Sequence, residues 1–262
     1  MSDDQQRRKG KTTADMPEKT ESNNNEGMTK RLIVSCSNKG GVGKSFFLIQ
    51  LIEWLNEHPS NPTFAAFDPD SANRTLLTYH KESTTFVDVD KVSSLDVVGA
   101  ALENVDISIL DGLGSQQKKT ILAWMDEVGL FELADELGFR ITFVAMIEED
   151  RDVILQTKEL LAVVGKKVDW VFVVNKKNAK DGLLWEGSAV RKTGLNELGG
   201  IEIVLERVTD PMQMYLSKEI LPISVADSGP RVNVYDRNRF RNLWKRISAE
   251  ITKAEKYFLP VA

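Results

Sequence analysis

Short apolar runs alternate with longer amphipathic stretches along most of this chain, from about residue 30 to its end. The apolar runs predict β-strands over residues 32–35, 63–67, 86–89, 107–110, 141–146, 170–174 and 201–205. The amphipathic stretches predict helices over residues 44–56, 94–102, 118–137, 152–164, 183–198 and 239–257. Several predicted strands are apolar at every position, which is typical of strands that helices cover on both faces of a sheet.

Strands and helices that alternate in this way predict an α/β fold, in which helices flank a doubly wound and mostly parallel sheet. Ligands of such sheets bind at the carboxyl ends of the strands. The segments that directly follow the strands are therefore where functional side chains are expected.

Residues 1–29 carry polar and charged side chains and almost no apolar ones. Such a composition cannot bury enough apolar surface to fold, so we expect a disordered tail ahead of one domain over residues 30–262. The cations Arg7, Arg8, Lys9 and Lys11 could contact DNA, although a solvated tail is the favoured interpretation.

The composition narrows the classes of function. The net charge of −5 means that any contact with nucleic acid must come from a local basic patch. The single cysteine, Cys36, excludes a disulfide within the chain and disfavours a cysteine-based metal cluster. The chain shows neither a hydrophobic signal core nor an apolar run long enough to cross a bilayer, so a cytoplasmic location is expected.

The most informative motif is a glycine-rich segment at residues 39–45, which reads K-G-G-V-G-K-S between a predicted strand and a predicted helix. Glycines let backbone N–H groups curl around a phosphate, and the N-terminus of the following helix adds a positive potential. The ammonium of Lys44 would contact the β- and γ-phosphates, and the hydroxyl of Ser45 would join the shell of a Mg²⁺ ion. The motif and its context predict a phosphate-binding loop rather than a turn without a ligand.

The start of this loop departs from the usual G-x-x-x-x-G-K-[ST] pattern, because Asn38 replaces the first glycine and a second lysine, Lys39, follows it. The resulting K-G-G-x-G-K-[ST] form resembles the deviant Walker A motif of the ParA/MinD family of ATPases. The resemblance implies a homodimer that forms on ATP binding, in which Lys39 reaches across the interface to the partner's nucleotide. Residues 118–208 also look similar to plasmid-stability and conjugation proteins of the StbB and TraL type.

Two aspartates follow the second predicted strand, as Asp68-Pro69-Asp70. ParA/MinD relatives have a D-x-D pattern at this place, which implies that Asp68 lies near the metal and that Asp70 positions or activates the attacking water. A carboxylate can orient a water molecule and help to remove its proton. A simple strand-ending Asp-Pro turn is the alternative.

The run that ends at Asp111 is similar to a Walker B strand, which implies that Asp111 holds Mg²⁺, usually through a water molecule. Gly114 follows shortly after, and its backbone N–H could approach the γ-phosphate and sense its presence. The spacing between Asp111 and Gly114 is one residue shorter than in a pattern frequent among relatives. A simple Asp-Gly turn is the alternative.

Two residues are candidates for contact with the base. Asn175 ends the strand predicted at residues 170–174, where related ATPases read the adenine edge with an asparagine amide. Pro222 resembles part of the loop that lines their base pocket. The sequence N-K-K-N at residues 175–178 lacks the aspartate of the guanine-reading N-K-x-D pattern, which favours ATP over GTP.

The last predicted helix has one apolar face and a side rich in cations, among them Arg237, Arg239, Arg241, Lys245 and Arg246. These cations could contact DNA phosphates nonspecifically. An amphipathic helix with a solvated polar side is the alternative. A peripheral membrane helix is disfavoured, because the apolar face is needed for the core.

The resemblance therefore implies a dimerising ATPase that hydrolyses ATP slowly without a partner and drives the partition or positioning of DNA cargo through an adaptor protein. A conjugation accessory protein, a MinD-type positioning ATPase and a nucleotide-binding regulatory module with little hydrolysis are the alternatives. The predicted catalytic residues are Lys39, Lys44 and Asp70. The predicted nucleotide contacts are Gly40, Gly41, Val42, Gly43, Lys44, Ser45, Phe46, Gly114, Asn175 and Pro222. The predicted Mg²⁺ ligands are Ser45, Asp68 and Asp111.

Overall fold

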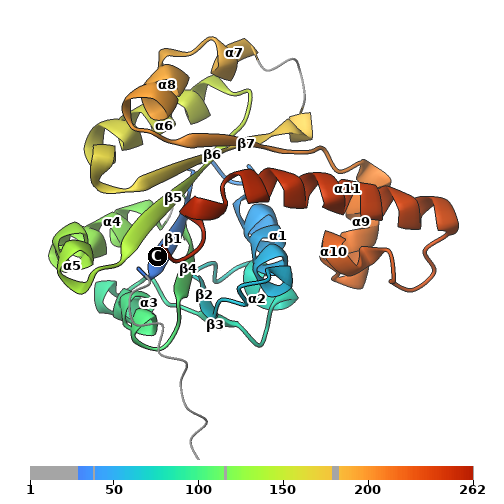
Figure 1. Ribbon diagram of the computed structural model, residues 1–262, viewed down its shortest axis with the longest axis horizontal. Helices are drawn as coiled ribbons and strands as arrows, with labels where there is room; N and C mark the ends of the chain where they lie inside the picture. The colour runs from blue at the N-terminus through green and yellow to red at the C-terminus, as the bar shows by residue number, and fades with distance from the viewer. Residues whose placement is uncertain (1–28, 38, 115–116, 179–182, 262) are drawn as a thin grey trace, which may run out of the picture.

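The computed structural model describes residues 29–37, 39–114, 117–178 and 183–261 (Figure 1). The predicted disordered tail lies outside the described residues except for Thr29, and so does Asn38 of the glycine-rich motif.

One seven-stranded sheet forms the centre of the protein, with strand order β3-β2-β4-β1-β5-β6-β7. Every pairing between neighbouring strands is parallel. The strands are β1 (Arg31–Cys36), β2 (Phe64–Asp68), β3 (Thr84–Phe86), β4 (Ile107–Leu113), β5 (Arg140–Ile147), β6 (Asp169–Asn175) and β7 (Ile201–Leu205). This topology confirms the predicted α/β class and the doubly wound, parallel sheet.

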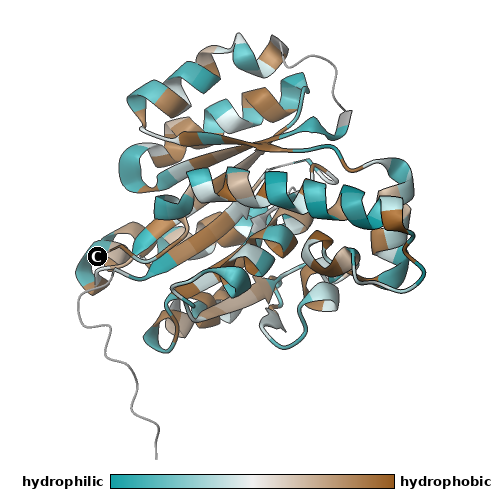
Figure 2. Cartoon of the chain, turned by 45° about the vertical axis from the view of Figure 1, so that its right-hand side comes forward, coloured by the Kyte–Doolittle hydropathy of each residue, from teal (hydrophilic) through white to brown (hydrophobic). Residues whose placement is uncertain are grey.

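Helices cover both faces of the sheet and form two separate apolar cores (Figure 1). One face is covered by α1 (Lys44–Glu57), α2 (Thr75–Tyr79), α9 (Asp210–Glu219), α10 (Ile223–Ala226) and α11 (Val234–Lys253). The other is covered by α3 (Asp96–Ala100), α4 (Lys118–Glu127), α5 (Leu130–Leu137), α6 (Arg151–Val164), α7 (Leu183–Glu186) and α8 (Ala189–Lys192). Figure 2 shows the apolar strands enclosed between helices that turn many polar residues outward.

Two of the predicted helices are interrupted. The helix predicted over residues 118–137 is divided into α4 and α5 at Gly129, whose φ of 57° is left-handed and cannot continue a right-handed helix. The helix predicted over residues 183–198 consists of α7, α8 and a π-helical turn at Thr193–Glu197. Ser188 separates the first two, because its side chain caps α8 by accepting a hydrogen bond from the backbone N–H of Arg191.

Other elements also differ from the prediction. The strand predicted over residues 86–89 lies earlier, at Thr84–Phe86, where it pairs only with β2 at the edge of the sheet. The helices α2, α9 and α10 are absent from the prediction. The last helix begins at Val234 rather than near residue 239, because Asn233 caps it with a side-chain oxygen that accepts from two backbone N–H groups.

The amino ends of the strands are closed by a buried arginine and by the C-terminal segment. Arg31 is fully buried, and its guanidinium donates to the carboxylate of Asp169 at 2.8 Å and to the hydroxyl of Thr142 at 2.8 Å. It also donates to the carbonyl oxygens of Lys256 and Leu259. At the same edge, a single antiparallel bridge joins Thr29 to Val261. The carboxyl ends of the strands, on the opposite side of the sheet, are where ligands of such folds bind.

Candidate active site

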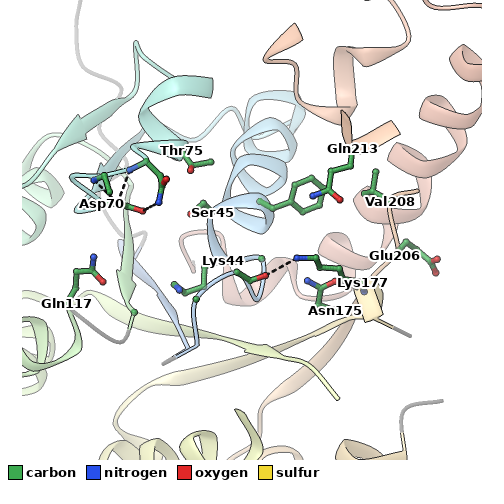
Figure 3. A pocket seen from close by; sticks show the side chains of 17 residues that line it. Lys44, Ser45, Asp70, Thr75, Gln117, Asn175, Lys177, Glu206, Val208 and Gln213 are labelled. Atoms are coloured by element: carbon green, nitrogen blue, oxygen red, sulfur yellow. Dashed lines mark hydrogen bonds between the residues drawn. The ribbon is translucent and has the colours of Figure 1, made fainter. Parts of the chain in front are cut away.

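A cavity of about 610 Å³ lies at the carboxyl edge of the sheet, above the start of α1 (Figure 3). It is lined by Gly40, Gly41, Gly43, Lys44, Ser45, Phe46, Asp70, Ala72, Asn73, Thr75, Gly114, Gln117, Asn175, Lys177, Glu206, Val208 and Gln213. Most of the predicted site residues therefore meet in one place. In Figure 3, Asp70 and Gln117 lie at one end, Asn175, Lys177, Glu206, Val208 and Gln213 at the other, and Lys44 and Ser45 between them.

The glycine-rich loop has the backbone that a phosphate cradle requires. Gly41 and Gly43 adopt left-handed φ values of 74° and 98°, which side chains other than hydrogen rarely allow. A Cβ atom added to Gly40 or Gly41 would meet nothing within 4 Å, so their backbone is open to the cavity. Because α1 begins at Lys44, the free N–H groups of its first turn and its positive dipole end point toward the same space.

Asn175 fastens this loop to the end of β6. Its side-chain Nδ2 donates to the carbonyl oxygen of Val42 at 2.8 Å, and its Oδ1 accepts from the backbone N–H of Lys177 at 2.9 Å. A Cβ atom on Gly43 would lie only 2.6 Å from the same Nδ2. Asn175 lines the cavity, whereas Val42 is buried beneath the loop and does not line it.

Three predicted metal ligands lie at the bottom of the site. Asp111 is buried and accepts a hydrogen bond from the hydroxyl of Ser35 at 2.8 Å; burial raises its pKa despite hydrogen bonds from Ser45 and Ser35 and the nearby ammonium of Lys44. Burial likewise raises the pKa of Asp68, whose carboxylate accepts from the backbone N–H groups of Asp70 and Leu77.

Of these three ligands only Ser45 lines the cavity. Within the part of the chain that the structure describes, no group of three or more His, Cys, Asp or Glu residues is arranged to hold a metal by itself. One hydroxyl close to carboxylates suits Mg²⁺, which prefers oxygen ligands and keeps several waters and substrate phosphates in its shell.

Asp70 organises the loop between β2 and α2. Its Oδ1 accepts from the backbone N–H groups of Ala72 at 2.9 Å and Asn73 at 3.0 Å, and its Oδ2 accepts from the side chain of Asn73 at 3.0 Å. Partial burial acts to raise the pKa of Asp70, but the hydrogen bonds from Asn73 and Ala72 and the charge of Lys44 outweigh it and hold the pKa below its usual value. Asp70 is therefore ionised where it lines the cavity.

Lys39 does not line the cavity. Its ammonium donates to the carboxylate of Asp150 at 2.7 Å and lies 3.8 Å from the carboxylate of Glu148, both of which follow β5. The hydrogen bond to Asp150 raises the pKa of Lys39. The side chain remains 43% exposed, so it can leave this carboxylate for another partner.

Gly114 lies where the prediction places it, after β4 and next to the phosphate loop. A Cβ atom at this position would lie 2.7 Å from Oε1 of Gln117 and 3.7 Å from the ammonium of Lys44. The side chains of Lys44 and Gln117 therefore converge on Gly114 from α1 and from the start of α4. A side chain at position 114 would therefore require the end of the Gln117 side chain to move.

The opposite end of the cavity holds four residues that sequence reasoning missed. These four are Lys177, Glu206, Val208 and Gln213, and the predicted contact Phe46 also lines the cavity. Glu206 and Val208 directly follow β7, so the rule that ligands bind at the carboxyl ends of strands could have found them. Lys177 donates to the carbonyl oxygen of Gly41 at 3.3 Å. Pro222, predicted to contact the base, precedes α10 and is not among the residues that line the cavity.

The predicted basic surface on α11 is partly neutralised. Arg239 pairs with Asp236 at 2.6 Å, and Arg241 pairs with Asp227 at 2.5 Å. Arg237, Lys245 and Arg246 are exposed and make no ion pair with another described residue. No helix in the described ranges combines the length and the apolar character that a membrane span requires.

We compared the chain with protein families, with curated proteins and with solved structures to identify proteins that share its fold. No family model matches the chain. Protein MobD from Acidithiobacillus ferrooxidans is 23% identical over 225 residues, which cover 84% of this chain and 97% of that protein.

Among solved structures, the MinD protein of Pyrococcus horikoshii in complex with Mg-ADP is similar with a TM-score of 0.54 and 14% identity over 87% of this chain and 98% of that one. An McdA–ATP complex from Cyanothece is similar with a TM-score of 0.53 and 12% identity over 90% and 100% of the two chains. The chain therefore has the fold of the MinD and McdA proteins, which confirms the fold expected from the ParA/MinD resemblance. The StbB and TraL branch stays a prediction.

Proposed function

We propose that this protein is a P-loop ATPase that binds ATP with Mg²⁺, pairs with a second copy of itself and hydrolyses the nucleotide to time that association. The observation that carries the proposal is the cavity in which the glycine-rich loop, Lys44, Ser45, Asp70 and Gly114 meet. The MinD and McdA structures with the same fold hold Mg-ADP and ATP, respectively.

The residues of the cavity suit a nucleoside triphosphate laid across it. The open N–H groups of the loop and of the first turn of α1 would bind the phosphates, and Lys44 would stabilise the charge that develops on them. Ser45 would hold Mg²⁺ together with Asp111 through water, with Asp68 nearby, and the bound ion would neutralise phosphate charge. Asp70 would hold the attacking water, and the backbone of Gly114 would contact the γ-phosphate.

The base would occupy the end of the cavity near Val208 and Gln213. The ring of Phe46 offers an apolar surface, while the side chains of Gln213, Glu206 and Lys177 offer both donors and acceptors for the base and the ribose. The side chain of Asn175 is already hydrogen-bonded to Val42 and Lys177. It would therefore support nucleotide binding mainly by holding the glycine-rich loop in its conformation.

Dimer formation would use Lys39. In the single chain Lys39 pairs with Asp150, but both side chains are partly exposed and the pair is worth little in water. The triphosphate of a partner subunit carries more negative charge than one carboxylate, so ATP in the partner would draw Lys39 away from Asp150. Loss of the γ-phosphate would weaken this attraction and release the dimer.

The proposed cargo is DNA, held through an adaptor and through exposed cations of α11. Arg237, Lys245 and Arg246 are the cations available for phosphate contacts, since Arg239 and Arg241 already have carboxylate partners. Retention on DNA that needs ATP and falls with rising salt would support this role. Sedimentation with liposomes instead of DNA would favour a positioning protein that works on membranes.

The dimer can be tested by sizing the protein with and without a slowly hydrolysed ATP analogue. We expect the wild-type chain to shift from monomer to dimer, and Lys39→Ala to stay monomeric while still binding the analogue. Lys119→Ala, which removes an exposed lysine of α4, is the matched control. If Lys39→Ala dimerises as well as the wild type, the cross-subunit role of Lys39 is wrong.

Hydrolysis is tested by steady-state phosphate release. We expect slow release from the wild type and much slower release from Asp70→Ala, because the water loses one of its partners. Undiminished turnover in Asp70→Ala would remove this residue from the mechanism. Calorimetry that detects no binding of magnesium-ATP to the wild type would rule out the proposed function altogether.

A further inference from the structure

We propose that the side-chain amide of Gln117 is a second group, besides Asp70, that positions the attacking water. The inference rests on the proposed ATPase function and names a residue of its reaction. Gln117 occupies the N-cap position of α4, three residues after Gly114, and lines the same cavity as Lys44 and Asp70.

The position of Gln117 is firmly held by the backbone around it. The N–H of Lys118 donates to the carbonyl oxygen of Gly114 at 2.9 Å, and the N–H of Ile121 donates to the carbonyl oxygen of Gln117 at 3.0 Å. The side chain therefore starts from a fixed helix terminus. In Figure 3 it lies at the end of the cavity that also holds Asp70, with Lys44 between the two residues and the base end.

The amide of Gln117 points to the place where the γ-phosphate is expected. Its Oε1 lies 2.7 Å from the position of a Cβ atom on Gly114, and the ammonium of Lys44 lies 3.7 Å from the same point. Lys44 marks the terminal phosphates of a bound triphosphate. The amide oxygen thus lies close to Lys44, and so to the expected place of the γ-phosphate, and the lack of a side chain at Gly114 leaves room for it.

The amide is also free to take a new partner. Gln117 is half-buried, and its side chain makes no hydrogen bond with another residue in the described ranges. An amide without a protein partner can hydrogen-bond to a water molecule or to a ligand that enters the cavity. The other glutamine of the cavity, Gln213, lies at the base end and cannot serve this purpose.

Asp70 by itself leaves the water poorly oriented. A carboxylate offers about four acceptor positions. Those of Asp70 already receive hydrogen bonds from two backbone N–H groups and from the side chain of Asn73. The carboxylate can therefore accept one hydrogen from a water molecule. A second acceptor, Oε1 of Gln117, would fix the other hydrogen and turn the oxygen lone pair toward phosphorus.

The chemical step requires no proton on either side chain. The water oxygen forms a bond to the γ-phosphorus while the bond from that phosphorus to its bridging oxygen breaks. ADP leaves with the electron pair, and a proton of the water passes to an oxygen of the transferred phosphate. The products are ADP and inorganic phosphate, so the amide of Gln117 acts by direction and not as a base.

The test is Gln117→Met, which keeps the length of the side chain but removes the amide. We expect the rate of a single turnover of ATP to fall roughly tenfold to a hundredfold, because orientation of the nucleophile is lost. Affinity for ATP and dimer formation with the slowly hydrolysed analogue should not change. The control, Gln156→Met, makes the same change on α6 outside the cavity and should retain the wild-type rate.

A Gln117→Met protein that turns over ATP at the wild-type rate would overturn the inference, and so would a fall caused only by weaker ATP binding. If the methionine variant does not fold, Gln117→Ala and Gln117→Asn decide the question in the same way, since both lack an amide of the required reach. If the wild-type chain binds ATP but releases no phosphate, the proposed ATPase reaction is wrong. If the wild type hydrolyses ATP and the Gln117 variants do so at the same rate, only the role of Gln117 is wrong.

Discussion

Charged side chains at the amino ends of the strands differ from those at the carboxyl ends in how many partners they have within the protein. At the amino ends of the strands (the amino edge), each nitrogen of the buried Arg31 guanidinium donates a hydrogen bond, and Asp169 is shared between Arg31 and Arg140. At the carboxyl ends of the strands (the carboxyl edge), the ammonium of Lys44 lines an open cavity. A charge that stabilises the fold is enclosed by its partners, whereas one intended for a ligand is left accessible.

The carboxylates show the same contrast. Burial acts to raise the pKa of Asp169, but the hydrogen bonds from Arg140 and Arg31 hold it below its usual value. Asp68 and Asp111 at the carboxyl edge have raised pKa values, because burial outweighs the hydrogen bonds that they receive. The cations that would lower the pKa of these two carboxylates are expected to arrive with the ligand.

The largest effect is expected from breaking the amino edge. Asp169→Asn leaves the guanidinium of Arg31 buried without its counter-charge, which should lower the free energy of unfolding by about 3–5 kcal/mol. Denaturant unfolding measures this loss, and the ATP affinity of the remaining folded protein should be unaffected. Asp126→Asn, on the exposed side of α4, should change stability by less than about 0.5 kcal/mol. Equal losses in the two variants would contradict the role given to Arg31.

Breaking the carboxyl edge should affect activity and leave stability intact. Lys44→Ala removes the cation that stabilises the transferred phosphate, so turnover should fall roughly 10²–10³-fold. Thermal unfolding without nucleotide should give the wild-type midpoint, since Lys44 lines a cavity and has no ion-pair partner within the described ranges. A marked loss of stability in Lys44→Ala would show that this edge, too, contributes charges to the fold.

A substitution in the glycine-rich loop tests whether the backbone shape at the carboxyl edge is needed to bind ATP, in addition to the charges there. Gly43→Ala would place a methyl group 2.6 Å from Nδ2 of Asn175, at a φ of 98° that alanine tolerates poorly. We expect a strain of about 1–3 kcal/mol and a roughly tenfold weaker affinity for ATP, measured by calorimetry. Adding Asn175→Ala removes the collision but not the strained φ, so it should restore the affinity only in part.

The smallest expected effect is a pH dependence of the stability that Asp169 contributes. Because the folded-state pKa of Asp169 lies below its unfolded value of about 3.8, its contribution is complete above that value and is lost as the pH falls through the folded pKa. The difference in stability between wild type and Asp169→Asn should therefore narrow below about pH 4. Urea unfolding of both proteins at pH 6 and pH 3 measures it. A constant difference would mean that the carboxylate charge is not what stabilises this edge.

The sequence predicts the sheet well and the helix breaks poorly. Apolar runs bounded by polar residues locate the interior strands, whereas β3 is short and Val87, just after it, is buried without extending the strand. Breaks depend on single residues, such as Gly129 in its left-handed conformation. The start of α9 carries a helix signal in Thr209 and Pro211 that the prediction overlooks.

The same distinction applies to the site. The phosphate loop, Asp70 and Gly114 could be predicted, because each follows directly after a strand and the topology brings those strand ends together. Gln117 and Gln213 reach the cavity from the first turns of helices. Whether these two side chains line the cavity depends on how α4 and α9 are rotated against the sheet. Packing against the sheet sets that rotation, and the local sequence pattern does not predict it.

The bridge between Thr29 and Val261 has a practical consequence for watching this protein in living cells. It joins segments from near the beginning and the end of the described residues, at the side of the sheet opposite the candidate site. A fluorescent protein fused beyond either residue would extend away from the face on which two subunits are expected to meet. Such fusions are therefore suited to following where the protein gathers, and how quickly it disperses, without obstructing its assembly.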